Sequence, residues 1–370
     1  MKREILGHVV RSVLALLMVI IIVVGFYLEY VVLQYYRIED KLSLNIVNKN
    51  TLQLDMEDTL SISTYNIGFG AYSQDYSFFM DEGYMKDGTY VKGIYAKAKS
   101  KEEVLKNTTG SIKTIEELNS DFIFFQEVDK EATRSYKVNQ YDMLLENFEN
   151  YDASYASNFH SAYLLYPFND IIGKTEAGIV TLSKYDLSSS TRYSLPIDEG
   201  FPTRFFDLDR CFSLNRINLS NGKELVLINV HLSAYDEGGI IRKLQLQVLN
   251  EILKQEYEKG NYVIAGGDFN HDIVNSINMF ETQQKVPEWV YQLNDDDLTS
   301  GYRFVSGNNN PTCRSSDMEY KEGVNYTVVI DGFIVSDNIN VLNATVIDQE
   351  GKLFLYSDHN PVKMEFKLIN

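Results

Sequence analysis

Residues 357–362 read Ser-Asp-His-Asn-Pro-Val, and an apolar run with the character of a strand, 362–368, follows directly. Pro361 marks the end of the preceding turn. Packing alone does not require an acid and a histidine at this point of the chain. The pair Asp358 and His359 therefore indicates chemistry at the start of a strand.

Polar side chains also accompany other apolar runs of the sequence. Because the ends of adjacent buried strands meet at one edge of a sheet, such side chains gather on one rim, which is how α/β enzymes build their sites. The segments that follow this pattern are Thr64-Tyr65-Asn66-Ile67, Gln126-Glu127-Val128-Asp129, Asn229-Val230-His231-Leu232, Gly267-Asp268-Phe269-Asn270 and Ile330-Asp331-Gly332-Phe333.

Each segment taken alone also has a plainer interpretation. His231 fits a hydrogen-bonded core histidine, and Asp268 with Asn270 fits an ordinary turn after a strand. Asn66 fits a turn residue, and Glu127 fits a strand-end contact with solvent. The argument for a site therefore depends on the whole ordered set.

Together and in this order, the segments resemble the endonuclease/exonuclease/phosphatase superfamily, which includes deoxyribonuclease I, apurinic-site endonucleases, neutral sphingomyelinases and inositol-polyphosphate 5-phosphatases. The resemblance covers roughly residues 60–368. It implies an α/β fold with two packed mixed β-sheets flanked by helices, the four-layer sandwich of deoxyribonuclease I. It also implies hydrolysis of a phosphate ester by in-line attack of water.

The resemblance further implies a role for each residue of the set. Glu127 becomes the principal ligand of a divalent cation, with Asn66 and Asp358 nearby, and these oxygen ligands suit Mg²⁺ or Mn²⁺ better than zinc. Asp268 and Asn270 would hold the attacking water, and His231 and His359 would contact the phosphate. Asp331 would accept a hydrogen bond from His359. Either Asp268 or His359 takes the proton of the water.

One further cation stands close to this rim. Arg134 follows the Glu127 segment and has the geometry to clamp a phosphate with two hydrogen bonds, although a surface ion pair explains it equally well. Between the first strand and the first helix, residues 68–99 form an insertion rich in Tyr, Phe and Gly. We expect this insertion to be either a lid or lipid-facing surface, or a segment packed on the edge of the sandwich.

The rest of the pattern indicates alternating strands and helices. Strands are expected at 60–67, 122–128, 177–182, 212–219, 225–232, 262–266, 326–335 and 362–368. One helix is expected after Ser100, where Glu103 completes a capping box, and another over 239–258 with Ile241, Leu244, Val248 and Ile252 on one face. We expect one catalytic domain at 59–370, preceded by a spacer at 37–58.

The N-terminus carries an uncharged apolar run long enough to cross a bilayer. We expect a transmembrane signal anchor at 12–36, after a short cytoplasmic N-terminus at 1–11. Bulky residues after the run argue against a cleavage site, and Lys2, Arg3 and Arg11 before it favour a cytoplasmic N-terminus. The lipid bilayer is then one partner, and the catalytic domain is extracytoplasmic.

The net charge of the chain helps to distinguish between substrate classes. The formal net charge is −18, and residues 1–40 contribute nothing to it, so the acidity belongs to the catalytic domain. An acidic domain grips a long polyanion poorly. We therefore expect a lipid head group or a small phosphodiester as substrate. A membrane-anchored nuclease is the alternative, and a non-catalytic binding module on the same fold is a third. Cys211 and Cys313 are expected to be buried thiols, with a disulfide left open.

Overall fold

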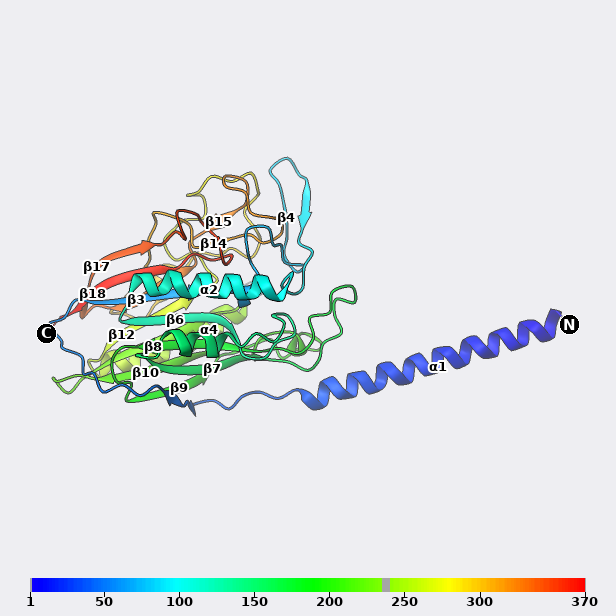
Figure 1. Cartoon of the computed structure of the whole chain (residues 1–370), viewed down its shortest axis with the longest axis horizontal. Helices are drawn as coiled ribbons and strands as arrows, with labels where there is room; N and C mark the ends of the chain where they lie inside the picture. Colours follow the sequence, from blue (N-terminus) through cyan, green and yellow to red (C-terminus); the bar gives the residue numbers. More distant parts are fainter. Residues whose placement is uncertain (1, 235–239, 370) are drawn as a thin grey trace.

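Two large mixed β-sheets form the body of the protein in this computed structural model, which describes residues 2–234 and 240–369 (Figure 1). The sheet that contains β12, here called the β12 sheet, has the order β1 (Leu42–Ser43), β9 (Ser189–Ser194), β10 (Cys211–Asn218), β11 (Glu224–His231), β12 (Tyr262–Asp268), β16 (Asp331–Ser336) and β13 (Tyr302–Val305). The β3 sheet has the order β17 (Ile339–Val346), β18 (Val362–Leu368), β3 (Leu60–Asn66), β6 (Phe122–Asp129), β8 (Glu176–Ser183), β7 (Asp152–His160) and β2 (Ile46–Val47). The predicted α/β sandwich is confirmed.

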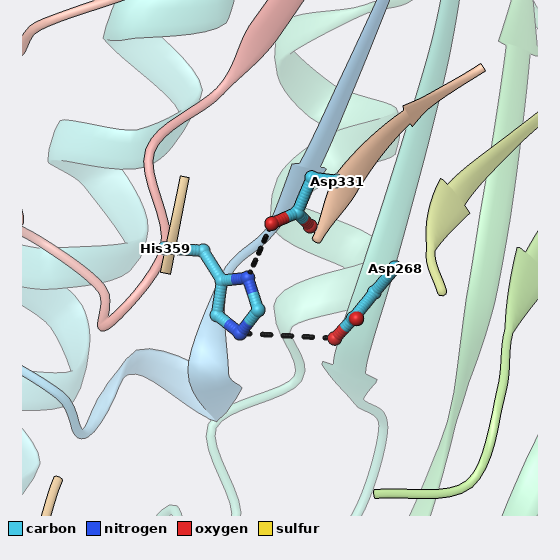
Figure 2. Close-up of side chains that lie close together, drawn as sticks. All are labelled: Asp268, Asp331 and His359. Carbon is cyan, nitrogen blue, oxygen red and sulfur yellow. Dashed lines mark hydrogen bonds and ion pairs between the residues drawn. The ribbon is translucent and has the colours of Figure 1, made fainter. Parts of the chain in front are cut away.

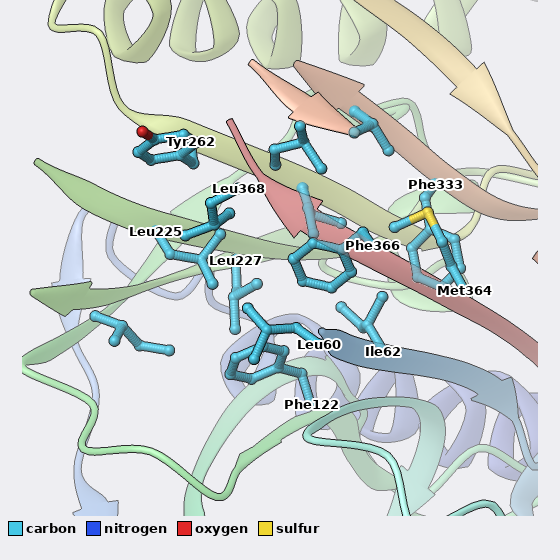
Figure 3. Close-up of a cluster of buried hydrophobic side chains, with 14 of the residues drawn as sticks. Leu60, Ile62, Phe122, Leu225, Leu227, Tyr262, Phe333, Met364, Phe366 and Leu368 are labelled. Carbon is cyan, nitrogen blue, oxygen red and sulfur yellow. The ribbon is translucent and has the colours of Figure 1, made fainter. Parts of the chain in front are cut away.

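The alternation of side chains along each strand explains the layers. In β6, Phe122 and Phe124 point between the sheets, whereas Ile123 and Phe125 point to the outer face. The inner cluster joins both sheets and is drawn in Figure 3, where Ile62 and Phe366 of one sheet face Leu227 of the other. Burial of this cluster supplies much of the hydrophobic stabilisation of the sandwich.

Helices cover the outer faces. α2 (Lys101–Leu118) and α3 (Gln140–Asn147) lie on the β3 sheet, and the side chain of Ser100 accepts a hydrogen bond from the backbone N–H of Glu103 as the capping signature predicts. α4 (Ile240–Glu258) covers the β12 sheet. Gly239, where this helix was expected to begin, lies outside the described residues.

The buried face of α4 differs from the predicted one. Leu246, Leu249 and Leu253 are buried, while Leu244 is exposed and Val248 is only partly buried. The same face also buries Arg242, Gln245 and Glu256. These polar residues interrupt the hydrophobic period, so the apolar pattern pointed to a neighbouring face of the helix.

One expected strand is broken in two. The run 326–335 forms β15 (Thr327–Val328), which pairs with β14 (Cys313–Arg314), and then β16 in the β12 sheet. At the break, Thr312 Oγ1 accepts hydrogen bonds from the backbone N–H groups of Ile330 and Asp331. The hydroxyl of Thr312 thus takes the place of a neighbouring strand as hydrogen-bond acceptor, and the chain passes here from β15 to β16.

The N-terminal helix α1 (Lys2–Gln34) extends away from the sandwich (Figure 1). Residues Glu4–Gln34 have a mean hydropathy of 2.8 in their most apolar window, and none of that window is buried, so this helix is long and apolar enough to cross a membrane. It ends at Gln34, before the expected limit at residue 36.

The segment 37–58, expected to be a spacer, is packed onto the domain. β1 and β2 pair with β9 and β7, one at the edge of each large sheet, and Leu54 and Met56 belong to the inner core. Arg37 pairs with Asp209 at 2.6 Å. The polar, irregular sequence concealed this packing because two-residue strands leave no periodic pattern.

The first part of the insertion 68–99 is packed on the domain, as the second alternative predicts. The insertion contains η1 (Gly68–Gly70) and a hairpin of β4 (Glu82–Tyr84) and β5 (Tyr90–Lys92). Its first part packs Phe69, Tyr72 and Tyr76 into a buried cluster beside α2. Phe69 and Tyr72 of this cluster, and Phe78, Met80 and Asp81 after it, line the pocket described below.

Candidate active site

Strand register places three polar side chains side by side at one end of the β12 sheet. His231 lies opposite Asp268 in the parallel pair β11–β12, and Asp268 lies opposite Asp331 in the antiparallel pair β12–β16. Directly opposite residues present their side chains on the same face. Gly267, with φ of +140°, lets the strands approach, since a Cβ there would lie 2.1 Å from the carbonyl oxygen of Val230.

His359 meets this row from the segment before β18 (Figure 2). Its Nδ1 donates to Oδ2 of Asp331 at 2.8 Å, and its Nε2 lies 3.7 Å from Oδ2 of Asp268. Burial disfavours the charged imidazole, but the negative charges of Asp331 and Asp268 prevail and hold the pKa of His359 well above its ordinary value. The structure therefore favours a positively charged His359.

Asp268 is the carboxylate at the centre of the row. Oδ2 accepts a hydrogen bond from Asn66 Nδ2 at 3.0 Å, and Oδ1 accepts one from the backbone N–H of Asn270 at 2.8 Å. Burial raises the pKa of this carboxyl group, the charge of His359 opposes the rise, and the charge of Asp331 adds to it. A carboxylate with a raised pKa is a stronger acceptor for the proton of a water molecule.

His231 has the opposite electrostatic character. Its Nε2 lies 3.6 Å from Oδ2 of Asp268, and within the described part of the chain its buried Nδ1 has no hydrogen-bond partner. Burial, followed by the positive charge of Arg210, holds the pKa of His231 well below its ordinary value. The two histidines of the site thus differ in charge, because only His359 has a carboxylate at hydrogen-bond distance.

Two further carboxylates converge from the β3 sheet. Glu127 stands in the β-bulge of β6, with φ of +56°, which turns its side chain towards Asn66 at 3.4 Å. Withdrawal from water raises the pKa of Glu127; nearby Arg134 opposes the rise and Asp358 adds to it. Both carboxylates are only partly buried.

This acidic pair fits a divalent cation. In the described residues, neither Glu127 nor Asp358 forms an ion pair, and their recorded side-chain partners are Asn66, Ser316 and Ser357. Two neighbouring carboxylates without a basic partner suit a hard cation that takes oxygen ligands. Asp268, Asp331 and His359 also lie within 4.8 Å of one another, but Nδ1 of His359 is already used by Asp331.

A pocket of about 260 Å³ gives access to these groups. Its polar side contains Glu127, Asp358, Asp268, His231 and His359. Its apolar side chains come from the insertion, from strand β7 and from loops, and include Phe69, Tyr72, Phe78, Met80, Phe159, Ile172, Phe206, Leu208 and Trp289. The pocket can therefore hold a charged group beside an apolar one.

Arg134, the predicted phosphate clamp, also lines the pocket, but its guanidinium is already paired. Nη2 and Nε donate to the carboxylate of Asp129 at 2.8 and 3.2 Å, and the guanidinium lies 4.0 Å from the ring centroid of Phe69. Arg134 therefore braces the turn after β6. The bidentate geometry expected for a phosphate is occupied by a carboxylate.

Among the pocket residues that the sequence motifs do not indicate are Arg210 and Asn158. Arg210 stands immediately before β10, and Asn158 lies within β7, in a segment that was not recognised as a strand. Neither belongs to a strand-end motif of the ordered set. Cys211 and Cys313 are both buried and unpaired, as expected for ordinary thiols.

Known proteins match this chain in sequence and in fold. The model of the Endonuclease/Exonuclease/phosphatase family matches residues 64–359. The inositol phosphosphingolipids phospholipase C of Schizosaccharomyces pombe is 25% identical over 210 residues, which are 50% of this chain and 48% of that protein. The match thus spans about half the length of that curated relative.

Solved structures agree. An endonuclease/exonuclease/phosphatase from Beutenbergia cavernae has a TM-score of 0.58 at 15% identity, covering 84% of this chain and 72% of that one. The human Nocturnin catalytic domain with bound sulfate has a TM-score of 0.52 at 13% identity, and the match covers 88% of this chain and 97% of that domain. These likenesses concern the fold. With the family model matching most of the sequence, the chain belongs to the Endonuclease/Exonuclease/phosphatase family.

Proposed function

We propose that this protein is a divalent-cation-dependent phosphodiesterase that hydrolyses a lipid head-group ester at a membrane surface. The observation that carries the proposal is that four of the six strand-end motifs line one pocket that also has an apolar side. Asn66 and Asp331, from the other two motifs, hydrogen-bond to Asp268 and His359 of that pocket. The reacting groups suit a phosphate ester, and the apolar side suits the lipid part of a substrate.

Different side chains have different roles in the in-line attack of water on the phosphate ester. Asp268, fixed by Asn66 and by the backbone of Asn270, accepts a proton from the attacking water. His359, charged and oriented by Asp331, donates a hydrogen bond to a phosphate oxygen, and neutral His231 adds a second contact. The side chain of Asn270 is bonded to the carbonyl of Leu232 at 2.8 Å, so it positions the turn that carries it.

Glu127 and Asp358, with Asn66 beside them, would hold the cation, which we propose to be Mg²⁺ or Mn²⁺. When bound, such a cation polarises a phosphoryl oxygen and offsets the negative charge that grows in the transition state. The oxygen-only ligand set disfavours zinc.

The position of α1 supports a substrate in the membrane. Tyr27 and Tyr30, in the last part of that apolar helix, hydrogen-bond to the backbone of Tyr163 and Leu165 at 3.0 to 3.3 Å. Tyrosine is common at the membrane–water interface. We therefore infer that α1 spans the membrane and that the loop of residues 161–175 rests at its surface.

Large apolar side chains on this loop, and on the loop 195–210 that contacts it, face solvent near the pocket. Phe168 is 84% exposed and Phe201 is 68% exposed. Tyr166 lies 6.4 Å from Phe206, measured between ring centroids, and Phe206 lines the pocket. Exposed aromatic residues of this kind mark a lipid or protein contact, and the adjacent membrane helix favours lipid. The Schizosaccharomyces pombe relative, an inositol phosphosphingolipids phospholipase C, agrees by its name with this substrate class.

The test uses the full chain in detergent and in lipid nanodiscs. Turnover of phospholipids, of a soluble phosphodiester and of plasmid DNA is measured with Mg²⁺, with Mn²⁺ and with chelator. We expect cation-dependent cleavage of a phospholipid, loss of turnover by about 100-fold or more in Glu127→Gln and His359→Gln, and unchanged turnover in the exposed control Glu319→Gln. Cleavage of DNA without lipid turnover would establish the nuclease alternative instead.

A further inference from the structure

Arg210 is a buried cation of the pocket wall, and no described residue forms an ion pair with it. Its side chain is only 4% exposed, and Nε and Nη1 have no hydrogen-bond acceptor in the part of the chain that the structure describes. Other buried arginines are paired: Arg134 with Asp129, Arg192 with Asp209 and backbone carbonyls, and Arg314 with the carbonyls of the insertion. A buried charge is retained at a cost unless something compensates it.

Asn158 presents a second unsatisfied donor in the same wall. This side chain of β7 is 1% exposed, and its Nδ2 also has no acceptor among the described residues. Both residues line the pocket together with His231, whose Nδ1 is unpartnered as well. Buried donors in a native protein are nearly always bonded, so these four nitrogens, which have no partner among the described residues, indicate a ligand with several acceptor oxygens.

The acidic residues of the pocket do not satisfy Arg210. Asp81 and Asp207 also line the pocket, yet no carboxylate oxygen of the described residues lies within 4 Å of the Arg210 guanidinium. The catalytic carboxylates have their own partners, His359 and Asn66. Because no described residue supplies an anion to Arg210, an anionic group of a ligand fits as its partner.

We propose that Arg210 and Asn158 form an oxyanion subsite that binds a phosphate group of the substrate on the His231 side of the pocket. The subsite rests on the proposed function, since the bound group belongs to the ester that is hydrolysed. The ligand is either the scissile phosphate itself or a second phosphate next to it. A guanidinium with a neighbouring amide donor suits the tetrahedral oxygens of either group.

Binding of inorganic phosphate to the full chain in detergent, with chelator present, tests the subsite without any turnover. Calorimetry and thermal unfolding compare the wild type with Arg210→Gln, Arg210→Lys and Asn158→Leu. We expect phosphate affinity to fall about 10-fold or more in Arg210→Gln, less in Arg210→Lys, and not at all in the control Arg303→Gln, whose guanidinium contacts the backbone of Ile339. Equal affinity in the folded Arg210→Gln and wild-type proteins would overturn the proposal.

Kinetics separates the two phosphate sources. The KM of Arg210→Gln is measured for a diester with one phosphate and for a diester that carries a second, terminal phosphate. An equal rise in both identifies the scissile phosphate, and a larger rise for the second substrate identifies the additional group. Unchanged KM for both would overturn the subsite while leaving the hydrolase intact. Phosphate binding that depends on Arg210 in a protein without hydrolysis would instead refute the proposed function alone.

Discussion

The side-chain amide of Asn66 donates a 3.0 Å hydrogen bond to the carboxylate of Asp268, and this bond joins the two sheets at the catalytic end of the sandwich. Asn66 ends β3, and Asp268 ends β12. The same amide lies 3.4 Å from Glu127. One side chain therefore connects the carboxylate assigned to the water with the carboxylate assigned to the cation.

Replacing Asn66 by alanine should damage both stability and activity. Asp268 would lose a buried donor, so the free energy of unfolding should fall by about 1–3 kcal/mol, and kcat should fall by about 100-fold because the base is no longer fixed. Urea unfolding and steady-state kinetics measure the two effects. Asn343→Ala, on the exposed face of β17, is the control. An Asn66→Ala protein with wild-type kcat would show that the link between the sheets is dispensable.

Asp331→Asn tests the orientation of His359. The amide keeps the shape of the carboxylate but removes the charge that faces Nδ1 of His359 at 2.8 Å. We expect kcat to fall by about 100-fold to 10,000-fold with a smaller change in KM, as for other carboxylate-supported histidines. A crystal structure of the variant would show whether the imidazole has turned. A kcat within threefold of the wild type, with the ring in place, would remove Asp331 from the mechanism.

Acid stability should depend on Glu256. Burial opposes its charge, but Arg216 at 2.7 Å, Lys259 and Asn261 prevail and lower the pKa of Glu256 to about 2. Because the folded pKa lies below the unfolded value, the stabilisation is complete above about pH 4.5 and is lost as the pH falls towards 2.

Glu256→Gln should therefore lose on the order of 2 kcal/mol of unfolding free energy at pH 7 and little at pH 2.5. Urea unfolding at pH 7, 5, 3.5 and 2.5 gives the profile. Glu251→Gln, on the exposed face of the same helix, should keep the wild-type slope. Parallel profiles for the wild type and Glu256→Gln would contradict the assigned pKa.

The exposed aromatic loops can be tested without touching the pocket. Phe168→Ser and Phe201→Ser remove large apolar side chains that face solvent. We expect the double variant to cleave phospholipid vesicles about 10-fold more slowly and a soluble diester at the wild-type rate. The matched control is Leu342→Ser, an exposed apolar residue on β17. Equal losses on both substrates would point to a folding defect rather than a lipid contact.

The sequence predicted the parts of the fold that have a strong local pattern. The strand with Phe122 to Phe125 is uniformly apolar, and the site residues at the strand ends stand in short motifs whose order is informative. The structure brings most of these residues into one pocket, and Asn66 and Asp331 hydrogen-bond to Asp268 and His359 there.

Elements without a local pattern were missed. β1 and β2 are two residues each, and the polar residues of α4 that face the core disturb its period. Arg210 lines the pocket because the pairing of β9 with β10 places it there. The residues next to Arg210 in the sequence do not predict this position. The sequence indicates neither that Arg134 pairs with Asp129 nor that this ion pair is buried.

Because residues 37–58 are packed on the sheets, the domain stays close to the end of α1. Between the end of α1 at Gln34 and the ion pair of Arg37 with Asp209, only Tyr35 and Tyr36 remain, and Tyr36 stacks on His160 at 4.1 Å. If α1 lies in a bilayer, a connection of two residues keeps the domain at the membrane surface. If the substrate is a lipid, as we propose, the two then meet by lateral diffusion in two dimensions. The rate should follow the mole fraction of that lipid in the membrane rather than its bulk concentration.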